Sequence, residues 1–126
     1  MIGLARLGTN DLDRAITFYD EVFAIAGVER LMANEKAGAW GTAGEPLFIV
    51  GKPFNGEDAT VGNGVMVGVP VSERAMVDAI HSKVIALGGK CEGEPGIRGD
   101  GANGFYAAYL RDLDGNKLCF FRRGPA

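Results

Sequence analysis

One pattern of predicted elements occurs twice in this chain, about 60 residues apart, and this repeat constrains the fold more than any other feature. In the first copy, residues 2–9 are predicted to form a strand. Residues 12–26 are predicted to form a helix, because apolar side chains recur there at helical spacing. In the second copy, residues 65–71 are rich in valine and favour a strand. The apolar stripe at residues 76–87 predicts another helix.

The ends of both predicted helices carry typical boundary residues. Asn10 or Asp11 is expected to cap the first helix and Ser72 the second, since their side-chain oxygens can accept free backbone N–H groups. Glycine adopts left-handed backbone without strain, so Gly27 and Gly88 are expected to end the two helices. The sequence therefore gives each copy a defined strand–helix unit.

Three predicted strands follow each helix. They fall at residues 29–32, 37–41 and 46–51 in the first half, and at 90–92, 105–110 and 117–122 in the second. The last two are joined by a predicted turn at residues 112–116, which favour local backbone bonding or positive φ. A polar segment at 53–62 links the halves. The pattern predicts one α+β domain, 1–126, with module one at 1–62, module two at 63–126, and helices over one face of the sheet.

The composition excludes several classes of protein. Thirteen Lys and Arg against sixteen Asp and Glu give a net charge of −3, whereas a nucleic-acid binder usually shows a basic excess. No apolar run approaches the roughly 20 residues that span a bilayer, and no signal peptide is evident. Cys91 and Cys119 are too few for a disulfide framework. We expect reduced thiols in a cytoplasmic protein, with a bridge between them left open, and neither nucleic acid nor membrane as a partner.

Two stretches resemble a known family. Residues 7–15, followed by Phe18 and Tyr19, resemble the opening of vicinal oxygen chelate (VOC) proteins, which include glyoxalase I, extradiol dioxygenases, fosfomycin-resistance enzymes and bleomycin-binding proteins. Residues 106–118 resemble the family's last hairpin, with Leu113 where its usual turn has proline. The resemblance covers essentially the whole chain. It implies two βαβββ modules that form a partly closed, eight-stranded barrel-like sheet with helices outside, a ligand pocket within it, and a homodimer.

The resemblance also implies where a metal would bind. Metal-dependent members carry a ligand, usually His or Glu, on the first and last strand of each module, and this chain has Leu4, Phe48, Met66 and Cys119 at those positions. Leu and Phe have no donor, whereas Met and Cys suit copper(I) better than nickel, zinc or iron(II). We expect no metal and no cofactor; a soft-metal site at Cys119 and Met66 is the alternative. His81, the single histidine, falls in a predicted helix and is expected to be structural.

Strand alternation extends the predicted pocket, because side chains at i and i+2 share a face. Arg6 is expected to accompany Leu4, either at a solvated edge or against an anionic ligand or an internal acid. Phe121 is expected to accompany Cys119, whose apolar neighbours favour an inert thiol over a nucleophile. Trp40 is expected in the pocket wall or in a dimer interface. Core packing is the alternative for each aromatic residue.

The register of the last hairpin decides which tyrosine faces the pocket. If Arg111 pairs with Lys117, Tyr109 lies opposite Cys119 and shares its face, whereas Tyr106 faces the other way. We therefore assign Tyr109 to the predicted pocket.

Residues 99–104 match the G-x-G-x-x-G motif. A strand is predicted after them instead of the helix that dinucleotide binding requires, so we reject that function. A flexible loop is the simpler interpretation, and the alternative is a cover over the pocket mouth that includes Arg98. The complete set of predicted ligand-binding residues is Leu4, Arg6, Trp40, Phe48, Met66, Arg98, Tyr109, Cys119 and Phe121.

The sequence predicts a metal-independent protein that binds an apolar or aromatic small molecule in the barrel pocket, with no catalytic residue assigned. The alternative is a metalloenzyme of the glyoxalase-like lyase kind, similar to lactoylglutathione lyase, or of the dioxygenase kind. A third possibility is a metal-free isomerase or lyase in which Tyr109, Arg6 or Cys119 acts as acid, base or anion holder.

Overall fold

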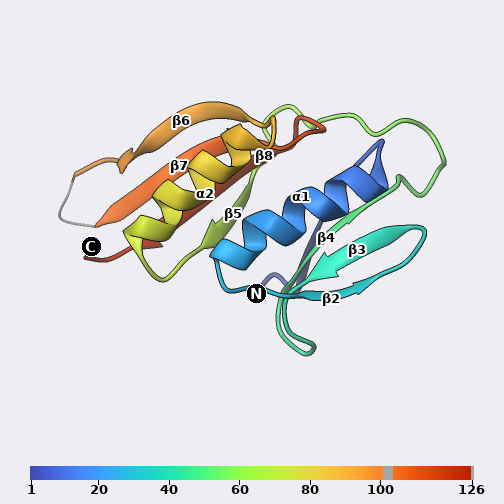
Figure 1. The fold of residues 1–126 in the computed structure, drawn as a ribbon, viewed down its shortest axis with the longest axis horizontal. Coiled ribbons are helices and arrows are strands. Elements are labelled where there is room, and N and C mark those ends of the chain that lie inside the picture. The colour runs from blue at the N-terminus through green and yellow to red at the C-terminus, as the bar shows by residue number, and fades with distance from the viewer. Residues whose placement is uncertain (101–103, 126) are drawn as a thin grey trace.

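The computed structural model describes residues 1–100 and 104–125, which form eight strands and two helices (Figure 1). In chain order they are β1 (Leu4–Gly8), α1 (Leu12–Ile25), β2 (Arg30–Ala33), β3 (Ala37–Trp40), β4 (Leu47–Gly51), β5 (Val67–Pro70), α2 (Arg74–Ala86), β6 (Lys90–Ile97), β7 (Phe105–Arg111) and β8 (Lys117–Arg123). The strand–helix–strand–strand–strand repeat predicted from the sequence is confirmed. Neither helix of this described part is long and apolar enough to cross a membrane.

The strands form two mixed four-stranded sheets of identical topology. The first sheet has the order β1-β4-β3-β2 and the second the order β5-β8-β7-β6. In each sheet the first strand pairs in parallel with the last strand of the module, and the remaining pairs are antiparallel. Strands β1 and β5 therefore form corresponding edges, and the sheets do not close into a barrel (Figure 1). This arrangement confirms the two βαβββ modules and is consistent with a partly closed barrel.

Both helices cover the same face of their sheets, and the core lies beneath them (Figure 1). Under α1, four aromatic rings pack together, with centroids 4.9 to 6.5 Å apart: Tyr19, Phe23, Trp40 and Phe48. Under α2, Leu110, Leu118 and Phe120 of the second sheet are completely buried. We use "open face" for the opposite side of each sheet, which no helix of the described residues covers.

The helix boundaries agree with the sequence at three of four ends. Asp11 caps α1, where its Oδ1 accepts from the Arg14 backbone N–H at 3.1 Å. Gly27 and Gly88 follow the two helices with φ of +74° and +100°, as predicted. The expectation for Ser72 is wrong: α2 begins one residue later, with Glu73 at the cap position and without a side-chain cap. The Ser72 hydroxyl instead lies 3.3 Å from the Met76 sulfur.

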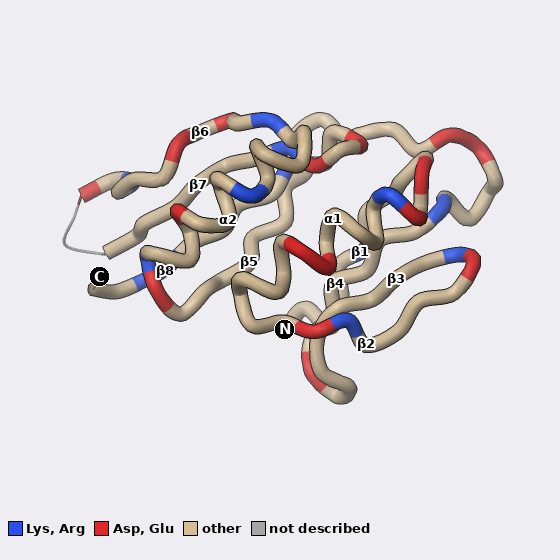
Figure 2. Tube along the Cα trace, viewed as in Figure 1, with Lys and Arg blue, Asp and Glu red and all other residues tan. Residues whose placement is uncertain are grey.

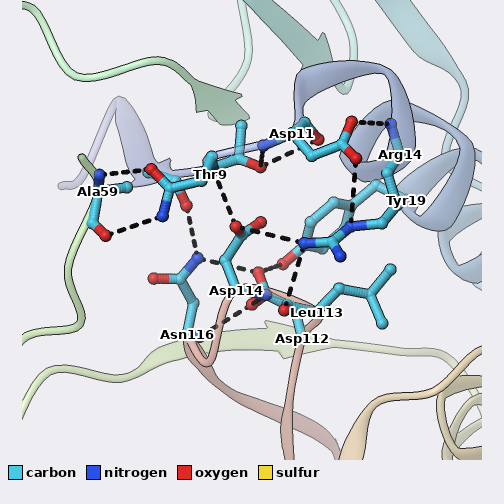
Figure 3. Close-up of polar contacts among 11 residues, drawn as sticks. Thr9, Asp11, Arg14, Tyr19, Ala59, Asp112, Leu113, Asp114 and Asn116 are labelled. Carbon is cyan, nitrogen blue, oxygen red and sulfur yellow. Dashed lines mark hydrogen bonds and ion pairs between the residues drawn. The ribbon is translucent and has the colours of Figure 1, made fainter. Parts of the chain in front are cut away.

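A buried polar network joins the two modules at the turn between β7 and β8 (Figure 3). The Tyr19 hydroxyl of α1 donates to Asp112 Oδ2 at 2.5 Å. Asn116 Nδ2 donates to the Gly8 carbonyl of β1 at 2.9 Å, and the Asn10 backbone N–H donates to Asp114 at 2.9 Å. These bonds cross about 100 residues of sequence and fix the second module against the β1–α1 junction.

Candidate functional site

A cavity of about 730 Å³ lies where the two modules meet. Its walls come from the edge strands β1 and β5, from β4, from the C-terminal end of α1 and from the loop between β3 and β4. Most of the lining is apolar, and Glu29 and Glu45 are its two charged members. A volume of this size suits a small organic molecule.

The cavity contains four of the nine predicted ligand-binding residues. Leu4 and Met66 project from the two strand edges and are about half exposed, at 55% and 46%. Trp40 and Phe48 also contribute to the lining, although their rings belong mainly to the core under α1. The Trp40 indole N–H donates to Asp20 at 3.0 Å, so its polar group points away from any ligand. The cavity therefore has a rigid aromatic floor and an accessible aliphatic rim.

The strand register corrects one of the four positions derived from the family pattern. Cys119 pairs with Gly68 of β5, two residues after Met66. In the first module, the residue two positions after Leu4 is Arg6, and its partner on β4 is Ile49. Ile49, not Phe48, is therefore the counterpart of Cys119. Phe48 pairs with Ala5, and its side chain faces the helix. The position predicted from the internal repeat was wrong by one residue, and a shift of one residue moves a side chain to the other face of a strand.

Arg6 lies outside the cavity. Its side chain is exposed, and Nη2 donates to the backbone carbonyl of Lys52 at 2.8 Å. The sequence left open whether Arg6 lies at a solvated edge, against an anionic ligand or against an internal acid, and in the structure it lies at a solvated edge. Arg6 still shares the open face with Leu4, as strand alternation predicts.

The last four predicted residues lie together on the open face of the second sheet. Arg111 pairs with Lys117 and Tyr109 pairs with Cys119, so the condition on which the assignment of Tyr109 depended is met. Phe121 is two residues further along β8 on the same face. The Arg98 guanidinium lies over the Tyr109 ring, with Cζ 5.3 Å from the ring centre. This group is separate from the cavity, because none of its members lines it.

Burial determines the state of the thiol in this group. Cys119 is 2% exposed, and desolvation raises the pKa of its thiol above the ordinary value of about 9. A hydrogen bond with Tyr109 and the charges of Arg98 and Lys117 lower the pKa but do not offset burial. The thiol therefore stays protonated near neutral pH, which disfavours both nucleophilic attack and metal ligation.

His81 and Tyr106 lie on the helix-covered side of the second sheet, and part of the predicted loop at 99–104 lies outside the described residues. His81 is in α2 and belongs to the helix-covered side of the second sheet, so it does not approach Cys119. Tyr106 also faces that side, as predicted, and its hydroxyl donates to Asp78 of α2 at 2.6 Å. Of the loop predicted at 99–104, residues 101–103 lie outside the described part, so its role as a cover stays a prediction.

Sequence reasoning missed the contribution of loops to the cavity. Glu29, Glu45 and the residues around Gly27 and Val28 line it, yet they follow no strand or helix periodicity. Their positions depend on how α1 ends and on where β4 begins. No pattern in the sequence connects those two places.

Two βαβββ modules with a cavity between them form an architecture that can be compared with known protein families. Residues 2–120 match the family model described as Glyoxalase/Bleomycin resistance protein/Dioxygenase superfamily. The chain therefore belongs to this superfamily, which is the VOC family of the sequence resemblance. No curated protein matches the chain.

Solved structures agree with this assignment. A glyoxalase/bleomycin resistance protein from Albidiferax ferrireducens T118 is 36% identical, with a TM-score of 0.89 over 98% of this chain and 99% of that one. Two more distant structures share the fold alone. They are lactoylglutathione lyase from Agrobacterium tumefaciens (23% identity, TM-score 0.66, 97% and 92% covered) and TioX from Micromonospora sp. ML1 (22%, 0.66, 98% and 99%).

The metal held by some members of the superfamily does not fit this chain. The four equivalent positions carry Leu4, Ile49, Met66 and Cys119, which offer no nitrogen and no carboxylate oxygen. Across residues 1–100 and 104–125, no group of three or more His, Cys, Asp or Glu side chains could hold a metal ion. Nickel, zinc and iron(II) sites are built from such groups.

Proposed function

We propose that this protein binds an apolar or aromatic small molecule in the cavity between its modules, without a metal. The observation that carries this proposal is the lining of the cavity. Leu4, Met66, Phe23, Trp40 and Phe48 supply aliphatic and aromatic surface, and Leu4 and Met66 stand at two of the four positions where metal-dependent relatives carry donors. A site of this composition gains affinity from the burial of apolar ligand surface.

The ligand is expected to be planar and largely uncharged. The aromatic floor favours stacking or edge contacts with a ring, and Leu4 and Met66 can adjust around it because they are half exposed. Among the described residues, the charged side chains that line the cavity are Glu29 and Glu45, so the lining offers an anionic ligand no partner.

Substitutions at the rim test this function. Leu4→Gln and Met66→Gln place an amide against the bound ligand, and because both side chains are about half exposed, these changes should leave the fold intact. A library of neutral aromatic compounds should raise the melting temperature of the original protein, and each substitution should weaken the best ligand about tenfold, in line with roughly 1–3 kcal/mol for an unpaired polar group. Leu31→Gln is the matched control, since Leu31 is similarly exposed but does not line the cavity. Absence of any stabilising compound, or equal affinities in all variants, would contradict the proposal.

We also propose a homodimer, in keeping with the superfamily. Ile2 and Val65 are exposed near the free edges of β1 and β5, where a second copy could cover them. Light scattering coupled to size-exclusion chromatography should give twice the mass of the chain. A monomer at all accessible concentrations would argue against it.

A further inference from the structure

The segment between β4 and β5, which joins the two modules, contains two asparagines that are each followed by glycine (Figure 1). These pairs are Asn55–Gly56 and Asn63–Gly64. An asparagine before glycine is chemically labile, because the glycine nitrogen can attack the side-chain carbonyl carbon and no Cβ atom of glycine hinders the approach. The surroundings of each pair determine how readily this attack takes place.

Hydrogen bonds restrain the first pair. The Asn55 Oδ1 accepts from the Glu57 backbone N–H at 3.0 Å, and the Asn55 Nδ2 donates to the Glu57 carboxylate at 3.1 Å. The Gly56 N–H, which contains the attacking nitrogen, donates to the Pro53 carbonyl at 3.1 Å. These bonds hold the side chain against Glu57 and turn the nitrogen towards Pro53. They therefore oppose the approach of the nitrogen to the side-chain carbonyl carbon.

The second pair lacks these restraints. Within the described part of the chain, no group forms a hydrogen bond with the Asn63 side chain or with the Gly64 N–H. Both residues are exposed, and a Cβ atom at Gly64 would meet no heavy atom within 4 Å. The turn that contains them has one long hydrogen bond, from the Val65 N–H to the Gly62 carbonyl at 3.4 Å. The pair can therefore leave this turn at little cost and reach the geometry of attack.

We propose that Asn63 is a site of spontaneous deamidation and isoaspartate formation. The Gly64 nitrogen bonds to the Asn63 Cγ, and its proton leaves with the side-chain amide group as ammonia. The product is a cyclic succinimide, which water then opens by adding to one of the two carbonyl carbons and breaking the bond from that carbon to the nitrogen. Opening at the side-chain carbonyl gives aspartate, and opening at the main-chain carbonyl gives isoaspartate.

The reaction changes the surface close to the cavity. Either product adds a negative charge to the turn, and isoaspartate also lengthens the main chain by a methylene group. The turn leads into β5, and Met66, which lines the cavity, follows shortly after Asn63. Asn63 itself lies outside the helices and strands, so the fold should persist. The reaction requires no ligand and is independent of the proposed function.

Ageing the full chain in warm, mildly alkaline buffer tests this assignment. Peptide mapping by tandem mass spectrometry measures the fraction of acid at Asn55 and at Asn63 over time, and electron-based fragmentation distinguishes isoaspartate from aspartate. The initial rate at Asn63 should exceed that at Asn55 by about tenfold, because the hydrogen bonds that protect Asn55 must first break. Equal rates, or a slower rate at Asn63, would overturn the proposal.

A second measurement shows whether the fold causes the difference. In concentrated urea the two rates should converge, because both segments then lack their native hydrogen bonds. A difference that persists unchanged in urea would show that neighbouring residues in the sequence cause it, which would contradict the structural account. The third such pair, Asn103–Gly104, begins outside the described residues, so its peptide is measured separately and does not enter the comparison.

Two substitutions complete the test. Asn63→Gln should abolish the reaction at this position, because the longer side chain would have to close a larger ring, and circular dichroism should show an unchanged fold. Glu57→Ala removes the acceptor of the Asn55 Nδ2 and should raise the rate at Asn55 about threefold while leaving that at Asn63 unchanged. An unchanged rate at Asn55 in this variant would contradict the protection assigned to Glu57.

Discussion

At the scale of single residues, Tyr19 illustrates how burial assigns a structural role to a group that could otherwise titrate. Desolvation, followed by the charge of Asp112, raises the pKa of Tyr19 well above its usual value of about 10. The phenol therefore remains protonated and donates to Asp112 at 2.5 Å. Asp112 also accepts from the backbone N–H groups of Asp114 and Asn116, so the carboxylate organises the whole turn.

Removal of the Tyr19 hydroxyl should destabilise the protein. We expect Tyr19→Phe to lower the free energy of unfolding by about 1–3 kcal/mol, because Asp112 loses a buried donor. Urea denaturation measures the change, and Tyr106→Phe, whose exposed hydroxyl also bonds an aspartate, should stay within about 0.5 kcal/mol. Since the pKa is raised in the folded state, the contribution of Tyr19 is complete below pH 10 and is lost as pH rises further. Equal effects of the two substitutions would contradict this account.

The two cysteines differ in burial and should differ in reactivity. Cys91 is exposed and Cys119 is buried, and neither forms a disulfide. Because burial raises the pKa of Cys119, we expect iodoacetamide at pH 8 to modify Cys91 much faster, and modification of Cys119 to increase only above pH 9. Mass spectrometry of the two peptides over time measures both rates, with the unfolded protein as the control in which the rates converge. Rapid modification of Cys119 at pH 8 would show that its thiol is accessible and activated.

At the scale of elements, the two helices begin in different ways although their modules share a topology. Asp11 accepts a backbone bond at the start of α1, whereas α2 starts at Arg74 without a side-chain cap. The second helix instead gains stability from Val77, Ile80 and Val84, which are completely buried against the sheet. Its start is therefore set by packing and not by a capping residue.

This difference can be measured with a matched pair of substitutions. Asp11→Ala should lower the free energy of unfolding by about 1 kcal/mol, the typical contribution of an N-cap. Ser72→Ala should change it by no more than about 0.5 kcal/mol, because the Ser72 hydroxyl accepts no helix N–H. Thermal or urea denaturation gives both values. A larger loss for Ser72→Ala than for Asp11→Ala would reverse the assignment of the caps.

Most elements could be predicted because their residues show strong periodicity or turn chemistry. The turn at residues 112–116 was predicted from its residue types, and it forms: the Gly115 N–H donates to the Asp112 carbonyl at 3.1 Å, and Gly115 has a φ of +89°. Strand β6 runs over Lys90–Ile97 and is longer than the strand predicted at 90–92. Gly93 and Gly96 lie within it, at places where its pairing with β7 is irregular. Glycines of this kind indicate a loop in the sequence, whereas here they accommodate bulges and the Arg98 side chain.

At the scale of the whole molecule, the sequence predicted the two modules but not which of their residues lie together in one pocket. The prediction joined residues from both sheets into one barrel pocket. The structure has two open sheets, with a cavity at their junction and a separate charged and aromatic group on the second sheet. The relative placement of the modules depends on long-range bonds such as Tyr19 to Asp112, which no local pattern encodes.

Charge is distributed over the whole molecule and not concentrated in one region. Lys and Arg alternate with Asp and Glu in both modules (Figure 2). With thirteen Lys and Arg against sixteen Asp and Glu, the sequence lacks the basic excess that nucleic-acid binders usually show.

The most direct test of the central claim is the metal content of the protein purified without added metal. The claim is that Leu4, Ile49, Met66 and Cys119 replace the donors of metal-dependent relatives, so that neutral ligands bind without an ion. Elemental analysis should find nickel, zinc and iron far below one equivalent per chain, with ligand affinity unchanged after treatment with a chelator. One equivalent of any of these metals, together with loss of ligand binding on chelation, would contradict the account.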